Sequence, residues 1–187
     1  TQVRGAAPAS SGAPASFVDD MSGQFYTGTT WSDTDTNSYV FNTGRTPAAN
    51  NTVYAFVTSR HASAAATPSG VGGMGLTWNL EGSVVHSGGG IRMTLYTGSH
   101  ASPSGTTFTA TFAGNQIACG VQLVEFANGG DPQVGLNWGT SATASAQLST
   151  PPGSGVMVAA AAREFQEGVQ TIEWTFLNGD WGADGQH

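Results

Sequence analysis

The stretch "GIRMTLYTGSHASPSGTTFTATF", residues 90–112, decides the fold class because it holds two alternating patterns on either side of a turn. In the first pattern, Ile91, Met93 and Leu95 alternate with Arg92, Thr94 and Tyr96. In the second pattern, phenylalanine or alanine alternates with threonine. A period of two, made of β-branched and aromatic residues, is typical of a half-buried strand. The segment "ASPSG" between the patterns has the composition of a turn. Two strands are therefore predicted, at 90–98 and 106–112.

The same patterns recur along most of the chain. Val53, Ala55 and Val57 share one face of a predicted strand at 52–60. Further strands are predicted at 74–86 with a break near Gly82, at 117–126, at 134–138, at 155–162 (in preference to a helix) and at 170–177. Segments such as "SGVGG" (69–73) and "HSGGG" (86–90) are predicted to be turns. Eight or more strands predict an all-β fold, an antiparallel, jelly-roll-like β-sandwich formed by residues 17–187 as one domain.

Composition narrows the classes of partner. The 187 residues include only 9% charged residues, and the formal net charge is −7. Lysine is absent, and the five arginines are scattered along the sequence. As far as composition can decide, these features exclude nucleic-acid binding, and they disfavour binding to an anionic membrane. No apolar run approaches the length of a membrane span.

Residues 1–16, "TQVRGAAPASSGAPAS", are small, contain proline and show no apolar periodicity. They are predicted to form an extended N-terminal arm that cannot hold itself in place. An ordered arm of this kind needs a holder outside its own domain, and we expect a neighbouring subunit. Trp181 follows the last predicted strand in a polar tail, where an aromatic side chain folds back or docks on a partner. The residues expected to bind the partner are Thr1, Gln2, Val3, Arg4, Pro8, Pro14 and Trp181.

The segment "WSDTDTNSYV" (31–40) places Asp33, Asp35 and Asn37 at alternate positions. This spacing opens an EF-hand loop, but Ser38 stands where the loop needs glycine and Gly44 where it needs glutamate, so an EF-hand is rejected. Two interpretations stay open. The three side chains could contribute oxygen ligands to a looser calcium site, or they could line the solvent face of an ordinary strand.

A catalytic arrangement is not evident in the sequence. Glu81, Glu125 and Glu173 lie in predicted strands beside aromatic residues, which would suit a glycosidase only if two of them faced each other across a cleft. His61, His86, His100 and His187 are far apart in the sequence, lack metalloprotease spacing and are interpreted as solvated loop residues. Cys119, the only cysteine, lies among apolar residues and is predicted to be a small buried side chain. Trp78 and Trp174 lie in strong strand patterns typical of core positions.

Four segments in the middle third of the chain resemble a known class of protein. They are "GLTWNLEGSV", "GIRMTLYTG", "SPSGTTFTATF" and "GVQLVEFANG". Their order resembles the β-sandwich modules of structural proteins in tailed bacteriophage virions, namely capsid decoration and minor tail proteins, and of some bacterial surface proteins. The resemblance implies a fold and a location on a virion or a surface, and it carries over no catalytic residue.

The function expected from these features is that of a non-enzymatic virion structural protein, a capsid decoration or cement protein located in the virion. It would dock on other virion proteins such as the major capsid protein, and on further copies of itself, through the arm and the tail. No nucleic acid, membrane or cofactor is expected. One alternative is a carbohydrate-binding adhesin or phage tail module, extracellular or at a cell surface, with calcium at Asp33 and Asp35. A glycan-cleaving enzyme is the third hypothesis.

Overall fold

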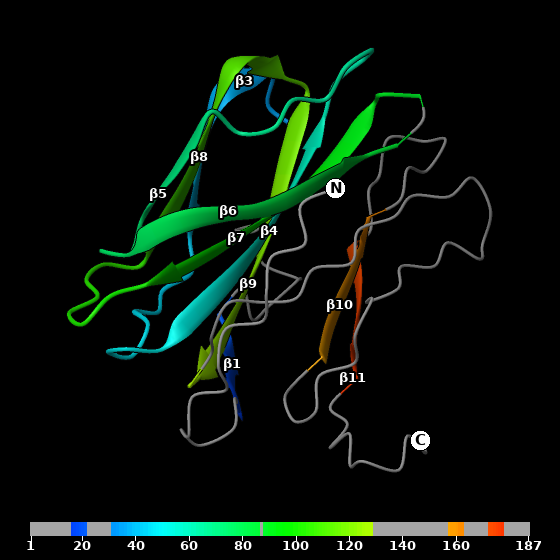
Figure 1. Cartoon of the computed structure of the whole chain (residues 1–187). Helices are drawn as coiled ribbons and strands as arrows, with labels where there is room; N and C mark the ends of the chain where they lie inside the picture. Colours follow the sequence, from blue (N-terminus) through cyan, green and yellow to red (C-terminus); the bar gives the residue numbers. More distant parts are fainter. Residues whose placement is uncertain (1–15, 22–30, 87, 129–156, 163–171, 178–187) are drawn as a thin grey trace, which may run out of the picture.

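The structure, a computed structural model, describes residues 16–21, 31–86, 88–128, 157–162 and 172–177. Within these residues the chain forms eleven β-strands and no helix (Figure 1). The strands are β1 (Ser16–Asp20), β2 (Trp31–Ser32), β3 (Thr36–Asn42), β4 (Thr52–Arg60), β5 (Gly70–Gly73), β6 (Thr77–Val85), β7 (Ile91–Ser99), β8 (Thr107–Gln116), β9 (Ala118–Ala127), β10 (Met157–Ala162) and β11 (Ile172–Leu177). The described part of the chain thus holds no helix long and apolar enough to cross a membrane.

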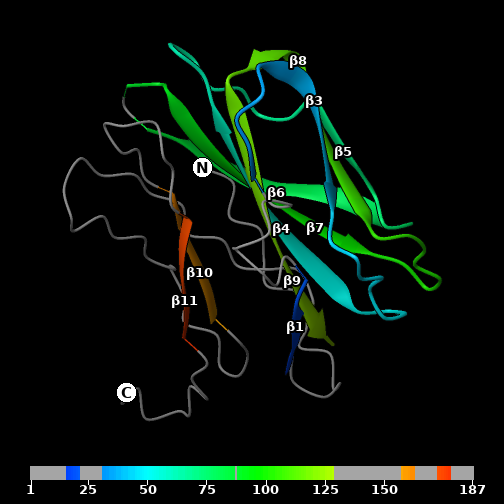
Figure 2. The ribbon, with the colours of Figure 1, turned by 180° about the vertical axis from the view of Figure 1, so that it is seen from behind.

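Nine of these strands build two antiparallel sheets that pack face to face. The larger sheet has the order β1-β9-β4-β7-β6, with β2 also paired to β9, and the smaller has the order β3-β8-β5. β10 and β11 pair with each other in a sheet of their own. In Figures 1 and 2 this pair lies on the side of the six-stranded sheet opposite to the three-stranded sheet. The prediction of an all-β, antiparallel β-sandwich is confirmed.

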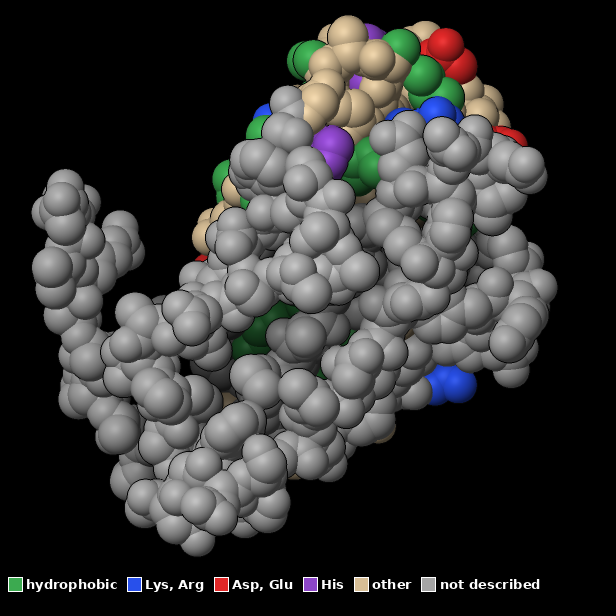
Figure 3. Space-filling view, turned by 90° about the vertical axis from the view of Figure 1, so that its right-hand side faces the viewer, with side chains coloured by type: hydrophobic (Ala, Val, Ile, Leu, Met, Phe, Trp, Pro, Cys, Tyr) green, Lys and Arg blue, Asp and Glu red, His purple; other side chains and the backbone are tan. Residues whose placement is uncertain are grey.

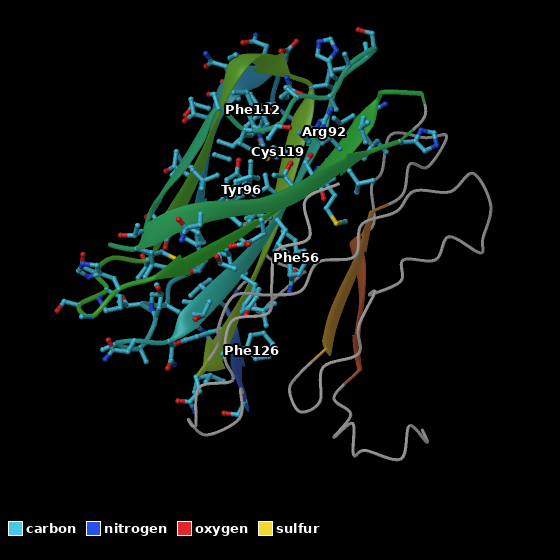
Figure 4. The ribbon with its side chains drawn as sticks, viewed as in Figure 1. Phe56, Arg92, Tyr96, Phe112, Cys119 and Phe126 are labelled. Carbon is cyan, nitrogen blue, oxygen red and sulfur yellow. The ribbon has the colours of Figure 1, made fainter. Side chains whose placement is uncertain are left out.

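The main core lies between the two sheets and is filled from alternate strand positions. The three-stranded sheet contributes Tyr39, Phe41, Phe108, Ala110 and Phe112, and the six-stranded sheet contributes Val53, Ala55, Val57, Tyr96, Cys119, Val121 and Leu123. Phe108 is fully buried, which stabilises the fold by about 1.5–3 kcal/mol relative to an exposed side chain. Figure 4 shows Tyr96, Phe112 and Cys119 within this core.

The six-stranded sheet is also buried on its second face. Phe56, Met93 and Leu95 form a separate apolar cluster there, against which Tyr54 and Val84 pack (Figure 4). Successive side chains of a strand point to opposite faces, so this cluster and the main core share the same strands. The strand predicted at 90–98 is confirmed as β7, but it is not half-buried, because β7 buries side chains on both faces.

The break predicted near Gly82 is confirmed: the pairing of β6 with β7 shifts register between Leu80 and Gly82. The strand predicted at 155–162 is also confirmed, as β10. The turn predicted for 69–73 is wrong, because residues 70–73 form β5 and pair with β8. At least one glycine of β5, Gly73, is required by the close approach of β8. Its φ is +100°, and a Cβ at this position would lie 1.9 Å from the carbonyl oxygen of Thr107, so only glycine can be accommodated.

The predicted strand at 134–138 lies outside the described residues. The same holds for residues 1–15 of the predicted arm, whereas Ser16 already begins β1, which pairs with β9.

Candidate binding surface

The outer face of the three-stranded sheet is uncharged, and we call it the β3-β8-β5 face. Alternate residues of these strands enter the main core, so the residues between them point outward. The outward positions are Ser38, Val40 and Asn42 on β3, Thr107, Thr109 and Thr111 on β8, and Gly70 and Gly72 on β5. None of these eight neighbouring positions carries a charged side chain.

The register of the strands makes the β3-β8-β5 face low in relief. Thr109 lies between Val40 on one side and Gly72 on the other. A Cβ at Gly70 or Gly72 would meet no atom of the described residues within 4 Å, so β5 adds no side-chain relief at these two positions. Val40 is 65% exposed, a high fraction for a β-branched apolar side chain at the middle of a strand. The face therefore offers hydroxyl groups and a methyl-bearing side chain to a flat partner.

Hydrogen bonds at one end of β3 hold this face in shape. The Asn42 Oδ1 atom accepts hydrogen bonds from the Gly44 amide at 3.0 Å and from the Thr106 hydroxyl at 2.7 Å. The Thr43 hydroxyl donates to the carbonyl of Thr106 or Arg45, each 3.0 Å away. These contacts tie the end of β3 to the beginning of β8.

Tyr39 anchors the other end of β3 from inside the core. Its hydroxyl lies 2.8 Å from the carbonyl oxygen of Thr34 and 2.5 Å from the carbonyl oxygen of Gln116. The hydroxyl has one proton, which it donates to the nearer Gln116 carbonyl. Burial is the main reason that the pKa of Tyr39 is raised to about 12, with a smaller contribution from Cys119. The phenol is therefore neutral at physiological pH, as a hydrogen-bond donor must be.

The candidate calcium ligands lie next to this anchor. Asp33 and Asp35 occupy the linker between β2 and β3, and Asn37 lies on β3. All three side chains are exposed. The alternation therefore does not belong to a single strand, which corrects the interpretation as a continuous solvent-facing strand. Among the described residues no group of three His, Cys, Asp or Glu side chains is arranged to hold a metal ion. Calcium binding by these oxygens stays a prediction.

The carboxylates considered for glycoside hydrolysis do not meet. Glu125 is buried on the core face of β9, where it accepts hydrogen bonds at 2.7 Å from the Ala48 amide and the Asn51 side chain. Glu81 accepts a hydrogen bond from Thr97, on the opposite face of the sheet. Two strands separate β9 from β6, so these two strands are roughly 14 Å apart and hold the carboxylates on opposite faces, whereas paired glycosidase carboxylates lie roughly 5–10 Å apart. The Glu173 side chain lies outside the described residues.

Each described histidine begins a turn at the end of a strand. The Nδ1 atoms of His61, His86 and His100 accept backbone hydrogen bonds from residues two positions further along the chain, at 3.2, 3.3 and 3.0 Å. In Figure 3, histidine and acidic side chains appear at the upper end of the molecule. Turn formation accounts for these three histidines, and His187 lies outside the described residues.

Cys119 is fully buried, as predicted, and burial raises the pKa of its thiol well above the ordinary value. Trp78 is partly buried and packs edge-on against Phe108, with ring centroids 5.1 Å apart. Its indole nitrogen donates a hydrogen bond to the Gly73 carbonyl at 3.2 Å. Trp78 is thus part of the core margin, as its strand pattern predicts. Trp31 is also half-buried.

The residues predicted to bind a partner all lie outside the described residues: Thr1, Gln2, Val3, Arg4, Pro8, Pro14 and Trp181. The β3-β8-β5 face was not identified from the sequence. Two signals in the sequence mark it, namely threonine at every second position of 107–111 and the exposed-buried alternation of "SYVFN" at 38–42.

The chain matches no family model, no curated protein and no solved structure.

Proposed function

We propose that the chain is a non-enzymatic structural protein of a virion, a decoration protein that docks on neighbouring capsid proteins. The observation that carries this proposal is the β3-β8-β5 face, whose eight outward positions hold no charge. In this proposal the face is the docking surface, and the arm (1–16) and Trp181 add contacts of their own.

An uncharged face suits a permanent contact because interface centres are depleted of charged residues. Removing charged groups from water without an ion-pair partner costs free energy, whereas threonine and serine hydroxyls can exchange water for a hydrogen bond to a partner. Val40 is 65% exposed, and covering it would contribute about 1–2 kcal/mol. The low relief left by Gly70 and Gly72 allows a flat partner to approach the backbone.

The described aromatic residues favour assembly over glycan binding. A sugar-binding module needs exposed aromatic platforms, but Trp78 packs on Phe108 and Trp31 is half-buried. Tyr39 and Tyr96 are buried in the core. The resemblance of residues 74–126 to decoration and tail modules supports the same class of function.

The test is to follow the chain through purification of virus particles from its source. Particles separated on a density gradient are analysed by quantitative mass spectrometry. The proposal expects the chain to co-sediment with the major capsid protein in a constant ratio across the particle peak. A chain found only among free proteins, and retained specifically on a glycan array, would overturn the proposal in favour of the carbohydrate-binding alternative.

A further inference from the structure

We propose that β3 is an open edge that pairs antiparallel with β3 of a second copy of this chain. The paired strands would join two three-stranded sheets into one six-stranded sheet across a two-fold axis. This inference goes beyond the proposed function and does not depend on it, because a dimer could form whether or not the protein belongs to a virion.

The backbone geometry of β3 defines what its edge offers. Opposed residues of an antiparallel pair alternate between pairs that exchange both backbone hydrogen bonds and pairs that exchange none. The Thr43 amide donates to the Thr106 carbonyl at 2.9 Å, and this pair continues the register of Phe41 with Phe108. Phe41, and Tyr39 two residues before it, therefore use their backbone groups to bind β8.

The alternate residues of β3 point their backbone groups the other way. Ser38, Val40 and Asn42 direct their N–H and C=O groups to the edge that no other described strand covers. The Ser38 amide has only a long contact of 3.4 Å to the Thr36 hydroxyl. Within the described part of the chain, nothing bonds the Val40 N–H or C=O.

These free groups are self-complementary. If two copies of β3 run antiparallel with Val40 opposite Val40, then Ser38 of each copy lies opposite Asn42 of the other. All three outward-pointing positions then meet as pairs that exchange both hydrogen bonds. The two Val40 side chains, each 65% exposed in the single chain, would lie side by side on the β3-β8-β5 face. A two-fold axis generates this arrangement because both partners use the same surface.

From Ser38 onward, β3 lacks the features by which natural sheets protect their edges. Its sequence "TNSYVFN" contains no charged residue and no proline, two of the features that protect natural edges. Its register shift lies at its beginning, between Thr36 and Ser38, and leaves Ser38–Asn42 regularly paired with β8. Within the two packed sheets, the other edges are protected or short. β6 has Glu81 and a register shift at its middle, β1 contains Asp19 and Asp20, and β5 has only four residues. Two copies of an uncharged strand meet without like-charge repulsion.

The first test measures the mass of the full chain in solution by analytical ultracentrifugation over a range of concentrations. The wild type is expected to shift from 19.0 kDa towards twice that mass as concentration rises. The Val40→Pro variant removes the central N–H donor, which β8 does not use, and edge strands tolerate proline at such positions. It is expected to weaken self-association about tenfold or more, while Leu80→Pro on β6 provides a matched edge control that leaves association unchanged.

A second measurement does not depend on any variant and settles the case in which Val40→Pro fails to fold. Hydrogen exchange of the wild type is followed at the individual amides below and above the association concentration. The Val40 amide is expected to exchange rapidly at low concentration and at least tenfold more slowly at high concentration, whereas Tyr39 and Phe41 are protected throughout. A chain that stays at 19.0 kDa, or a dimer in which the Val40 amide still exchanges rapidly, would overturn the inference.

Discussion

The indole ring of Trp78 lies directly over Gly98 on the neighbouring strand. The two residues are register partners in the pairing of β6 with β7. A Cβ at position 98 would come within 2.6–2.8 Å of three carbon atoms of the ring. Gly98 thus provides the space in which Trp78 reaches Phe108 and covers the margin of the core.

Replacing Gly98 with alanine is therefore expected to destabilise the fold. The added methyl group must push the Trp78 ring away from Phe108, which we expect to lower the free energy of unfolding by about 1–3 kcal/mol. Urea unfolding followed by tryptophan fluorescence measures the change. Gly72→Ala is the matched control, since its Cβ meets no atom within 4 Å, and its effect should stay within about 1 kcal/mol. Equal losses in both variants would show that Gly98 has no special packing role.

The Tyr39→Phe variant tests the anchor of β3. It removes the hydroxyl that donates to the Gln116 carbonyl and lies 2.8 Å from the Thr34 carbonyl. We expect a loss of about 1–3 kcal/mol in the free energy of unfolding because a buried acceptor is left unsatisfied. Tyr96→Phe, whose hydroxyl makes a longer bond of 3.2 Å to Pro68, should cost less. A Tyr39→Phe protein as stable as the wild type would contradict the anchoring role.

Alkaline pH should destabilise the protein through the same side chain. The pKa of Tyr39 is raised to about 12 in the folded protein, above the value of about 10 for an unfolded chain. Folding therefore favours the protonated phenol, so its contribution is complete below pH 10 and is lost as the pH rises towards 12. The free energy of unfolding between pH 9 and 11.5 should fall less steeply in Tyr39→Phe than in the wild type. Identical slopes would indicate that Tyr39 titrates as an exposed phenol.

The thiol of Cys119 should be inert in the folded protein. It is fully buried, and burial raises its pKa, so the reactive thiolate is scarce and inaccessible. The rate of modification by a disulfide reagent at pH 8 is expected to increase with urea in parallel with unfolding. Rapid modification of a protein that keeps its native circular dichroism would show that the core opens locally at β9.

Much of the fold could be predicted because its strands carry their own signal. The period of two in 52–60 and 106–112 predicts β4 and β8, and the break at Gly82 predicts the register shift of β6. β5 could not be predicted, because "GVGG" has the composition of a turn and becomes a strand only through its pairing with β8. The burial of both faces of β7 is a property of the tertiary structure, which a two-residue period does not contain.

The candidate surface was harder to predict than the fold. Charged and metal-binding residues are the functional residues that a sequence shows most readily. The interpretation of Asp33 and Asp35 as calcium ligands is an example. The β3-β8-β5 face is defined instead by what its side chains lack, and its members come from three separate segments. The open edge at Val40 depends on which backbone groups β8 uses, and the sequence of β3 alone cannot show this.

The most direct test of the structural role is to return the purified chain to particles from which it has been removed. The wild type should bind at a constant number of copies per particle at saturation. Thr109→Lys places a charge at the centre of the β3-β8-β5 face and should abolish this binding, whereas Leu80→Lys, at an exposed position of β6, should bind like the wild type. If Thr109→Lys also saturates the particles, the uncharged face is not the docking surface. If the wild type does not bind at all, the protein is not a decoration protein.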